Sequence, residues 1–320
     1  MIQSVTGILP PEALTFCQCH EHILLSKGVS WQRNHALCME NTQKSMQELL
    51  DYRAAGGSTI VDAQPVGCNR MTKELVQLSR DSGVQIVAST GFHKDCFYPA
   101  EHWIHTYSQQ QLTEVYFHEL TKGMYVDADN AVPSQTISAK AGMIKTALDA
   151  EFSLLYEKLF HAAASAQCVT GAPLMIHVEM GSDPIRLFKF LSDCGVPAES
   201  MLFCHMDRSS PDLRQHHFLL KQGAYLEYDT IGRFKYHSDQ DELQLIQQVL
   251  DWGFERQLLL SLDTTAQRLK HYTPDGIGLT YLLHSFLPML KNSGVPEKTI
   301  DKICRENCAS ALRWKPKSNK

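Results

Sequence analysis

Residues 152–179 read FSLLYEKLFHAAASAQCVTGAPLMIHVE and contain one complete unit of the fold. Apolar residues in the first half recur at spacings of three and four, which predicts an amphipathic helix. Gly171 is suited to end this helix, because glycine takes the left-handed conformation after a last helical turn without a Cβ penalty. A short apolar run follows and ends at His177. The stretch therefore predicts a helix, a glycine, a buried strand and an ionisable side chain at the end of that strand.

The same order repeats along the chain. Short apolar runs predict eight strands, at residues 14–24, 58–64, 84–90, 141–147, 173–179, 201–207, 224–230 and 258–264. Segments with helical periodicity lie between them, and strands that alternate with helices imply parallel pairing through right-handed crossovers. Eight such units in 320 residues predict an α/β protein with a (β/α)8 barrel, the TIM barrel, which typically takes about 250 residues before insertions.

An open, doubly wound sheet is the main alternative, but no G-x-G-x-x-G motif follows the first strand, so dinucleotide binding lacks support. No shift in composition marks a second domain. We therefore expect one (β/α)8 domain over residues 1–314 and a disordered tail at 315–320. The longest insertion, residues 92–140, follows the third strand and is a candidate lid or pocket wall.

The composition excludes several classes of protein. A hydrophobic fraction of 43% and a charged fraction of 20% indicate a globular chain. The net charge of −5, without a basic cluster, argues against nucleic acid as a partner. No run is long and apolar enough for a membrane span, and the N-terminus has no signal-peptide pattern. The ten cysteines are scattered without a Cys-x-x-Cys motif, which predicts reduced thiols and a cytoplasmic location.

Ionisable side chains stand at the ends of five predicted strands. In a barrel these ends form the active-site face. Alternate residues of a strand point the same way, so the first strand would present two imidazoles together. Burying such groups unpaired would cost several kcal/mol each, so the cluster predicts a metal site at the C-terminal ends of the strands. Its members are His20, His22, Lys145, His177, His205 and Asp263.

Imidazole and carboxylate ligands suit Zn²⁺ above all, with Mn²⁺, Co²⁺ and Fe²⁺ as alternatives. Four histidines and one aspartate are more than one tetrahedral ion needs, so we expect two divalent ions roughly 3.5–4 Å apart. A Lys145 carboxylated by CO₂ could bridge them. The alternatives are a Lys145 that extends to solvent and a site with a single metal. Cys17, Cys19 and Cys204 flank ligand histidines, and strand alternation predicts that they point away from the metals into the core.

The ordered set of these residues resembles the phosphotriesterase family of the amidohydrolase superfamily, in particular its bacterial phosphotriesterase-homology branch, which includes lactonase-like members. Supporting motifs are Cys19-His20-Glu21-His22, Ala141-Gly142-Met143-Ile144-Lys145 and Tyr228-Asp229-Thr230-Ile231-Gly232. The resemblance spans roughly residues 7–312. It implies a more buried ion held by His20, His22 and Asp263, and a more exposed ion held by His177 and His205. It also implies that carboxylated Lys145 and a hydroxide bridge the ions, and that the protein forms a homodimer.

One motif departs from the family pattern. Phosphotriesterases proper carry His-x-Asp-Asp after the sixth strand, whereas this chain has His205-Met206-Asp207-Arg208. The second acid, part of their proton relay, is absent. The departure argues against efficient hydrolysis of organophosphates.

The resemblance predicts a hydrolase in which metal-activated hydroxide attacks a small-molecule substrate. Asp263 then moves the proton to the leaving group, and Lys145 is the other catalytic residue. We expect a lactone or related carboxyl ester, with an anionic or phosphorylated sugar lactone as the narrower candidate. Amide hydrolysis of small N-acyl compounds is the alternative. A catalytically silent metal-binding barrel is a third reading, disfavoured by the complete ligand set. The candidate substrate-binding residues are Phe92, His93, Tyr98, Asp229, Arg233, Lys235, Tyr236 and Arg268.

Overall fold

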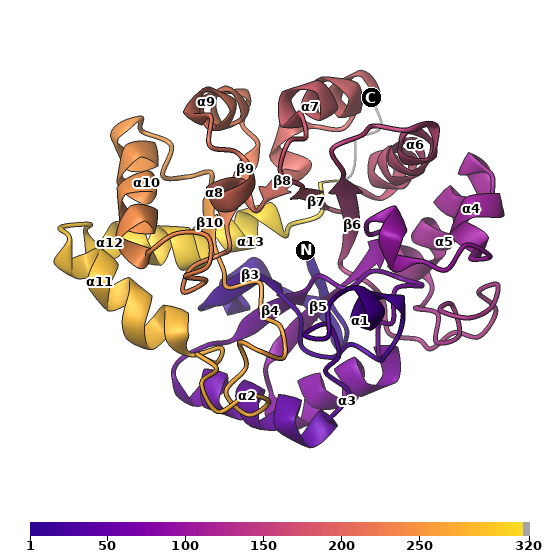
Figure 1. Ribbon diagram of the computed structural model, residues 1–320, viewed down its shortest axis with the longest axis horizontal. Helices are drawn as coiled ribbons and strands as arrows, with labels where there is room; N and C mark the ends of the chain where they lie inside the picture. Colours follow the sequence, from indigo (N-terminus) through magenta and orange to yellow (C-terminus); the bar gives the residue numbers. More distant parts are fainter. Residues whose placement is uncertain (316–320) are drawn as a thin grey trace.

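A computed structural model describes residues 1–315, and eight parallel strands form its central sheet in sequence order (Figure 1). The predicted (β/α)8 barrel is confirmed. Six of the eight strands lie within the predicted runs, and β5 and β6 each extend one residue beyond theirs. The strands are β3 (Cys17–Glu21), β4 (Thr59–Asp62), β5 (Gln85–Gly91), β6 (Met143–Leu148), β7 (Leu174–Val178), β8 (Met201–Cys204), β9 (Tyr225–Tyr228) and β10 (Leu258–Leu260).

A backbone hydrogen bond and the side chain of Glu21 close the barrel between β10 and β3. The backbone N–H of Asp263 donates to the carbonyl oxygen of His20 at 3.1 Å. The carboxylate of Glu21 accepts hydrogen bonds from the backbone N–H groups of Leu262 at 2.9 Å and Thr264 at 3.0 Å. A buried carboxylate thus supplies the acceptors that a longer strand ladder would otherwise offer, and it holds the first and last strands together directly beside the predicted metal ligands.

Helices cover the outside of the barrel (Figure 1). Glycine ends several of them as predicted: Gly83 and Gly171 are the C-caps of α3 and α6, with φ of 71° and 75°. The α-helices are α1 (Val29–Arg33), α2 (Thr42–Ala54), α3 (Thr72–Ser82), α4 (Trp103–Thr106), α5 (Gln109–Thr121), α6 (Leu154–Thr170), α7 (Pro184–Asp193), α8 (Met206–Ser209), α9 (Leu213–Gln222), α10 (Asp239–Asp251), α11 (Leu287–Asn292), α12 (Glu297–Asp301) and α13 (Cys308–Ala311). Short 3₁₀ turns lie at Pro11–Ala13, Asp95–Phe97 and Ala198–Ser200, and π-helical turns at Leu282–Phe286 and Lys302–Asn307.

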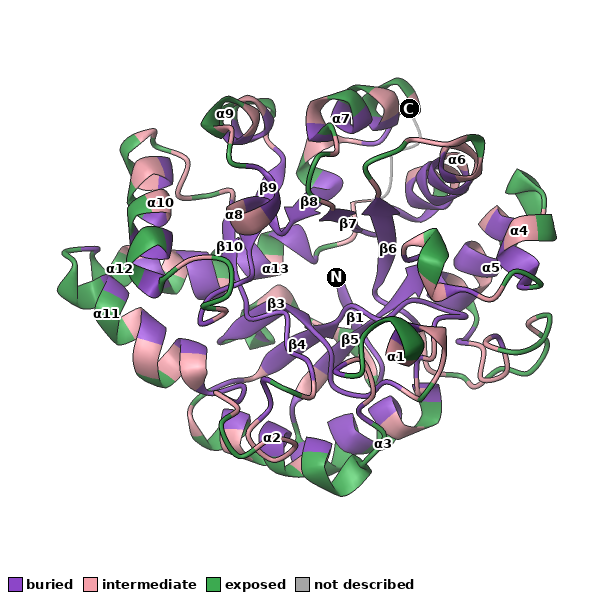
Figure 2. Ribbon diagram, viewed as in Figure 1, coloured by how far each residue is buried: buried purple, intermediate pink, exposed green. Residues whose placement is uncertain are grey.

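The core has two parts. The larger lies between the strands and the surrounding helices, and Figure 2 shows the buried strands inside a ring of helices whose outer faces are exposed. The smaller part includes Val61, Met175 and Leu259 from the strands. Ile2 from the N-terminal hairpin β1 (Ile2–Ser4) and β2 (Gly7–Leu9) packs there, as does Leu312 after α13. The two chain ends therefore pack against the same set of strands.

The 92–140 insertion is anchored to the side of the barrel. Arg70, before α3, forms a bidentate ion pair with Glu119 of α5, with contacts of 2.6 and 3.0 Å, and both side chains are buried. Helix α5 also packs along α6. Of this insertion only His93, Lys94 and Phe97 line the pocket described below, so it contributes part of a wall.

The predicted tail begins at a residue that is hydrogen-bonded: the backbone N–H of Lys315 donates to the carbonyl oxygen of Gly171 at 2.7 Å. The rest of that tail, residues 316–320, lies outside the described residues. Among the described helices, none combines the length and the apolar character that crossing a membrane requires.

Candidate metal centre

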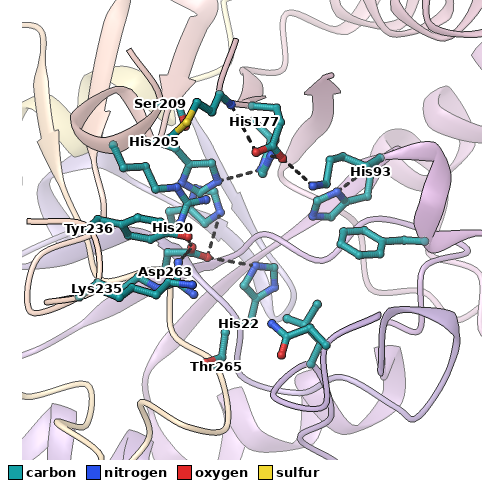
Figure 3. A pocket seen from close by; sticks show the side chains of 18 residues that line it. His20, His22, His93, His177, His205, Ser209, Lys235, Tyr236, Asp263 and Thr265 are labelled. Carbon is teal, nitrogen blue, oxygen red and sulfur yellow. Dashed lines mark hydrogen bonds and ion pairs between the residues drawn. The ribbon is translucent and has the colours of Figure 1, made fainter. Parts of the chain in front are cut away.

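The six predicted ligands converge at the C-terminal ends of the strands. Five of them, all except the more deeply buried Lys145, line a pocket of about 210 Å³ (Figure 3). Two of the ligands owe their direction to unusual backbone conformations, because His205 has φ of 61° and Asp263 has φ of 50°. Non-glycine residues rarely take this left-handed conformation, and where they do they are often part of a functional site.

His20, His22 and Asp263 form one group of donors (Figure 3). The Oδ1 atom of Asp263 lies 3.8 Å from Nε2 of His20 and 3.6 Å from Nε2 of His22. All three side chains are almost fully buried. Two imidazole nitrogens and one carboxylate oxygen therefore face a common point, as ligands of a single divalent ion do.

His177 and His205 form the second group. The Nδ1 atom of His177 and the Nε2 atom of His205 are 2.8 Å apart, and the planes of the two rings are nearly perpendicular. Two nitrogens that face each other in this way are placed to share one ion. The two groups are adjacent, since the rings of His20 and His205 have centroids 4.7 Å apart.

Lys145 lies beneath the first group, inside the barrel. Its side chain is fully buried, and its Nζ atom lies 3.2 Å from Nε2 of His20 and 3.3 Å from the sulfur of Met175. The side chain therefore does not extend to solvent. Burial lowers the pKa of the Lys145 ammonium, which favours the neutral amine. A neutral amine is the form that can react with CO₂.

Three of the histidines are held neutral by their surroundings. Burial lowers the pKa of His22 to about 3 and that of His177 to about 4, and it lowers the pKa of His205 well below its usual value. Each of these rings consequently keeps a lone pair at neutral pH. His20 differs: burial and Lys145 oppose its protonation, but the carboxylates of Asp229 and Glu227 raise its pKa to about 9. This part of the site therefore attracts positive charge.

Asp229, a predicted substrate-binding residue, is not among the residues that line the pocket and lies beside two of the histidines. Its Oδ1 atom accepts a hydrogen bond from Nδ1 of His205 at 2.6 Å. Its Oδ2 atom lies 3.1 Å from Nδ1 of His20. An acceptor at Nδ1 fixes the tautomer in which Nε2 is free to bind a metal. Burial opposes ionisation of Asp229, but the neighbouring His205 and His20 hold its pKa well below the usual range.

Two arginines contact the second oxygen of Asp263. Arg208 donates to Oδ2 at 3.2 Å, and Arg233 donates to the same atom. Burial opposes ionisation of Asp263, but the charges of Arg233 and Arg208 keep its pKa well below the usual range. The two oxygens of this carboxylate therefore have different surroundings, with histidine nitrogens at Oδ1 and guanidinium groups at Oδ2.

The structure divides the remaining predicted substrate-binding residues. His93, Arg233, Lys235 and Tyr236 line the pocket. Three others do not, and each has a structural role instead. Phe92 is fully buried and packs edge-to-face on Phe160. Tyr98 accepts a hydrogen bond from the backbone N–H of His93 at 2.8 Å. Arg268 donates to the carbonyl oxygens of Ile231 and Gly232.

Several pocket residues were not among the predicted ones. Lys94 and Glu179 form an ion pair of 2.5 Å in the wall, and Arg208 contributes the guanidinium described above. The position of Arg208 could have indicated its role, because it lies three residues after the histidine that ends the sixth strand. Asn34 and Leu37 reach the pocket from the loop that follows α1, and no sequence pattern marks them.

The donor set suits divalent cations. Neutral imidazoles, an ionised carboxylate and a buried amine of lowered pKa stand together, and the ring atom Nδ1 of His22 has no hydrogen-bond partner although it is buried. His20, His205 and Asp263 bring one donor atom each within 4.8 Å of one another. The arrangement can hold a pair of ions in a pocket that Arg208, Arg233 and Lys235 also line.

Comparisons with known proteins agree with this geometry. The model of the family described as "Phosphotriesterase family" matches residues 1–312. The chain is 28% identical over 330 residues to a phospho-furanose lactonase from Mycoplasmopsis synoviae (strain 53), covering 99% of this chain and 93% of the relative. It is 26% identical over 355 residues to an N-acetyltaurine hydrolase from Xenopus tropicalis, covering 98% of each. A solved lactonase structure from Listeria monocytogenes matches with a TM-score of 0.88 and 29% identity, covering 98% of this chain and 99% of that chain.

Proposed function

Because the chain belongs to the phosphotriesterase family and is a hydrolytic enzyme, we propose that it opens a lactone or related carboxyl ester that carries an anionic group. His20, His22 and Asp263 would hold one divalent ion, and His177 and His205 would hold a second. Carboxylated Lys145 would bridge the two. Zn²⁺ is the first choice of metal, since neutral imidazoles dominate the donor set.

The observation that carries this proposal is the placement of cations beside the donor groups. Arg208, Arg233 and Lys235 line the same pocket as the five metal-ligating side chains. Guanidinium groups bind phosphate and carboxylate oxygens in pairs of charge-assisted hydrogen bonds. A substrate with an anionic group could place that group on this wall and its carbonyl carbon over the donor groups. The phospho-furanose lactonase relative supports this choice of substrate class.

The chain's own residues would perform distinct steps. When bound, the metal pair would lower the pKa of a water nucleophile and polarise the substrate carbonyl. Asp263 would accept the proton from the water and return it to the alkoxide leaving group. Arg208 and Arg233 keep this carboxylate ionised before the proton arrives. Asp229 keeps His205 and His20 oriented throughout.

Amide hydrolysis is a second candidate, and the same cationic side chains, Arg208, Arg233 and Lys235, favour it. An N-acetyltaurine molecule is an anionic N-acyl compound, and the relatives with that activity match nearly the whole chain. Both candidates use the metal pair and the cations in the same way. They differ in the leaving group, which is an alkoxide from a lactone and an amine from an amide.

The test is a substrate panel with enzyme that has been reconstituted with Zn²⁺ and bicarbonate. We expect hydrolysis of a phosphorylated five-membered sugar lactone at a kcat/KM well above that of its unphosphorylated form and of N-acetyltaurine. The variant Arg233→Gln should remove most of the preference for the phosphorylated lactone. Arg256→Gln, which changes an exposed arginine outside the pocket, is the matched control. Faster cleavage of N-acetyltaurine would establish the amidase instead, and no hydrolysis of either class would refute both candidates.

A further inference from the structure

A second cluster of potential ligands lies apart from the metal centre. Asp207 of α8, His237 of the loop between β9 and α10, and Glu242 of α10 bring one donor atom each within 4.8 Å of one another. The Nε2 atom of His237 lies 3.2 Å from Oε2 of Glu242 and 3.9 Å from Oδ2 of Asp207. The cluster shares no residue with the six ligands of the metal centre.

The two carboxylates are buried, and three of their four oxygens accept no hydrogen bond from the described residues. The side chains of Asp207 and Glu242 have no solvent exposure. Neither oxygen of Glu242 accepts a hydrogen bond, and Oδ1 of Asp207 accepts none either. Only Oδ2 of Asp207 is satisfied, by the backbone N–H and the hydroxyl of Thr230 at 2.7 and 2.5 Å. An ionised carboxylate that is buried without an ion-pair partner or a metal destabilises the folded state. A cation bound to these free oxygens would remove that penalty.

The surroundings supply little positive charge. Within residues 1–315, no lysine or arginine forms an ion pair with Asp207 or Glu242. Arg208 is adjacent in sequence, but its guanidinium is directed to Asp263. Asp229 and Asp239 add further negative charge near Glu242. Among the described residues, His237 is the one basic side chain that lies within 4 Å of the carboxylates of Asp207 and Glu242.

We propose that Asp207, His237 and Glu242 bind a third divalent cation, Zn²⁺ or Mn²⁺. A ligand set of one imidazole and two carboxylates suits both ions. Bond lengths near 2.1 Å place neighbouring donors about 3.0–3.5 Å apart, so the observed separations of 3.2 and 3.9 Å need only small side-chain rotations. The hydroxyl of Thr230 lies 3.0 Å from Nε2 of His237 and borders the same space.

A cation at this site would hold the loop between β9 and α10 in place. His237 ends the loop that carries Arg233, Lys235 and Tyr236 into the pocket. A cation held by His237, Asp207 and Glu242 would fasten this loop to α8 and α10. The ion would therefore stabilise the cationic wall without contacting the substrate. The proposal concerns metal binding alone, and it stands whichever substrate the enzyme uses.

The experiment compares the metal content of wild-type protein with that of Glu242→Gln and His237→Asn. Each protein is stripped of metal, loaded separately with excess Zn²⁺ or Mn²⁺ in the presence of bicarbonate, desalted and measured by plasma mass spectrometry. Glu297→Gln and His35→Asn, which change exposed residues of the same types, are the controls. We expect both cluster variants to hold about one equivalent less than wild-type and control proteins with at least one of the two metals.

Equal metal content in all five proteins, with both metals, would overturn the proposal. The two carboxylates would then share a proton instead, and metal-free Glu242→Gln should be at least as stable as wild-type protein. Circular dichroism verifies that each variant is folded before loading. Because the side chain of His237 is partly exposed, His237→Asn decides the question if Glu242→Gln does not fold. The readout is independent of catalysis, so a wrong substrate assignment would not affect it.

Discussion

Arg208 donates a hydrogen bond to Oδ2 of Asp263 at 3.2 Å, at the chain position where phosphotriesterases proper carry their second acid. A cation thus stands where their proton relay has a carboxylate. The contact leaves Oδ1 of Asp263 facing His20 and His22. The arginine at this position therefore places a guanidinium in the pocket, beside the carboxylate of Asp263.

Replacement of Asp263 by asparagine should abolish most turnover without unfolding the protein. An amide cannot accept and return the proton, and loss of general acid–base catalysis typically costs about 10²–10⁴-fold. The measurement is kcat on the best lactone of the panel, with metal content determined on the same samples. Asp251→Asn, at the end of α10, is the control. Retention of near-normal kcat by Asp263→Asn would exclude the proton-transfer role.

Replacement of Asp229 by asparagine should weaken metal binding more than it weakens folding. The amide cannot serve as a charged acceptor for Nδ1 of both His205 and His20. Loss of such an outer partner typically lowers metal affinity about 10–100-fold. Competition for Zn²⁺ with a chromophoric chelator measures the change. If Asp229→Asn binds Zn²⁺ as tightly as wild-type protein, Asp229 does not orient the ligands.

Replacement of Lys145 by methionine should lower the metal content of the protein. Methionine fills a similar volume inside the barrel but cannot form a carbamate. We expect about two equivalents of metal at the centre of the wild-type protein and fewer in the variant, each loaded with Zn²⁺ and bicarbonate. Wild-type protein loaded without CO₂ should resemble the variant. Metal content that responds neither to Lys145→Met nor to CO₂ would exclude the bridge.

The buried pair of Arg70 and Glu119 should be essential for anchoring the 92–140 insertion. Arg70→Met would leave a buried carboxylate unpaired, which typically costs about 3–5 kcal/mol. Denaturant unfolding measures the loss. The double variant Arg70→Met/Glu119→Gln should be less destabilised than the sum of the two single variants, because its members share one interaction. Strict additivity would show that the two side chains act independently.

His102 should make the insertion sensitive to acid. Burial lowers its pKa to about 4 from the ordinary 6.5, so the unfolded chain binds a proton that the folded chain does not. The free energy of unfolding should therefore fall as the pH drops from about 6.5 to about 4, by up to roughly 3 kcal/mol. His102→Asn keeps an N-cap for α4 and should flatten this dependence. An unchanged pH profile of stability in His102→Asn would contradict the assignment.

Local sequence patterns predicted the fold and the six ligands. The unit around Gly171 shows why: a helix period, a glycine and an apolar run are properties of neighbouring residues. Parallel strands must also end on one face of a barrel, so His177, His205 and Asp263 had to meet once the strands were recognised. Topology alone brings them together, and the prediction needed no side-chain detail.

Strand alternation is interrupted where the backbone is irregular. Cys17 and Cys19 pack in the smaller core, as predicted. The register of β3 against β4 shifts between Gln18 and Glu21, and this bulge also lets His20 face inward. A bulge inserts one residue and reverses the alternation beyond it, which periodicity cannot reveal.

The sequence by itself determined the barrel, the face that bears the site and the candidate metal donors that gather there, because these follow from local periodicity and from the parallel order of strands. Only the tertiary structure decided which loop residues reach the pocket. It placed Arg208 at Asp263 and took Phe92 and Arg268 out of the pocket. Among the described residues, it left both oxygens of Glu242 and Oδ1 of Asp207 without a hydrogen-bond donor. Those outcomes depend on backbone turns and side-chain packing between segments far apart in the chain, where no local pattern specifies the geometry.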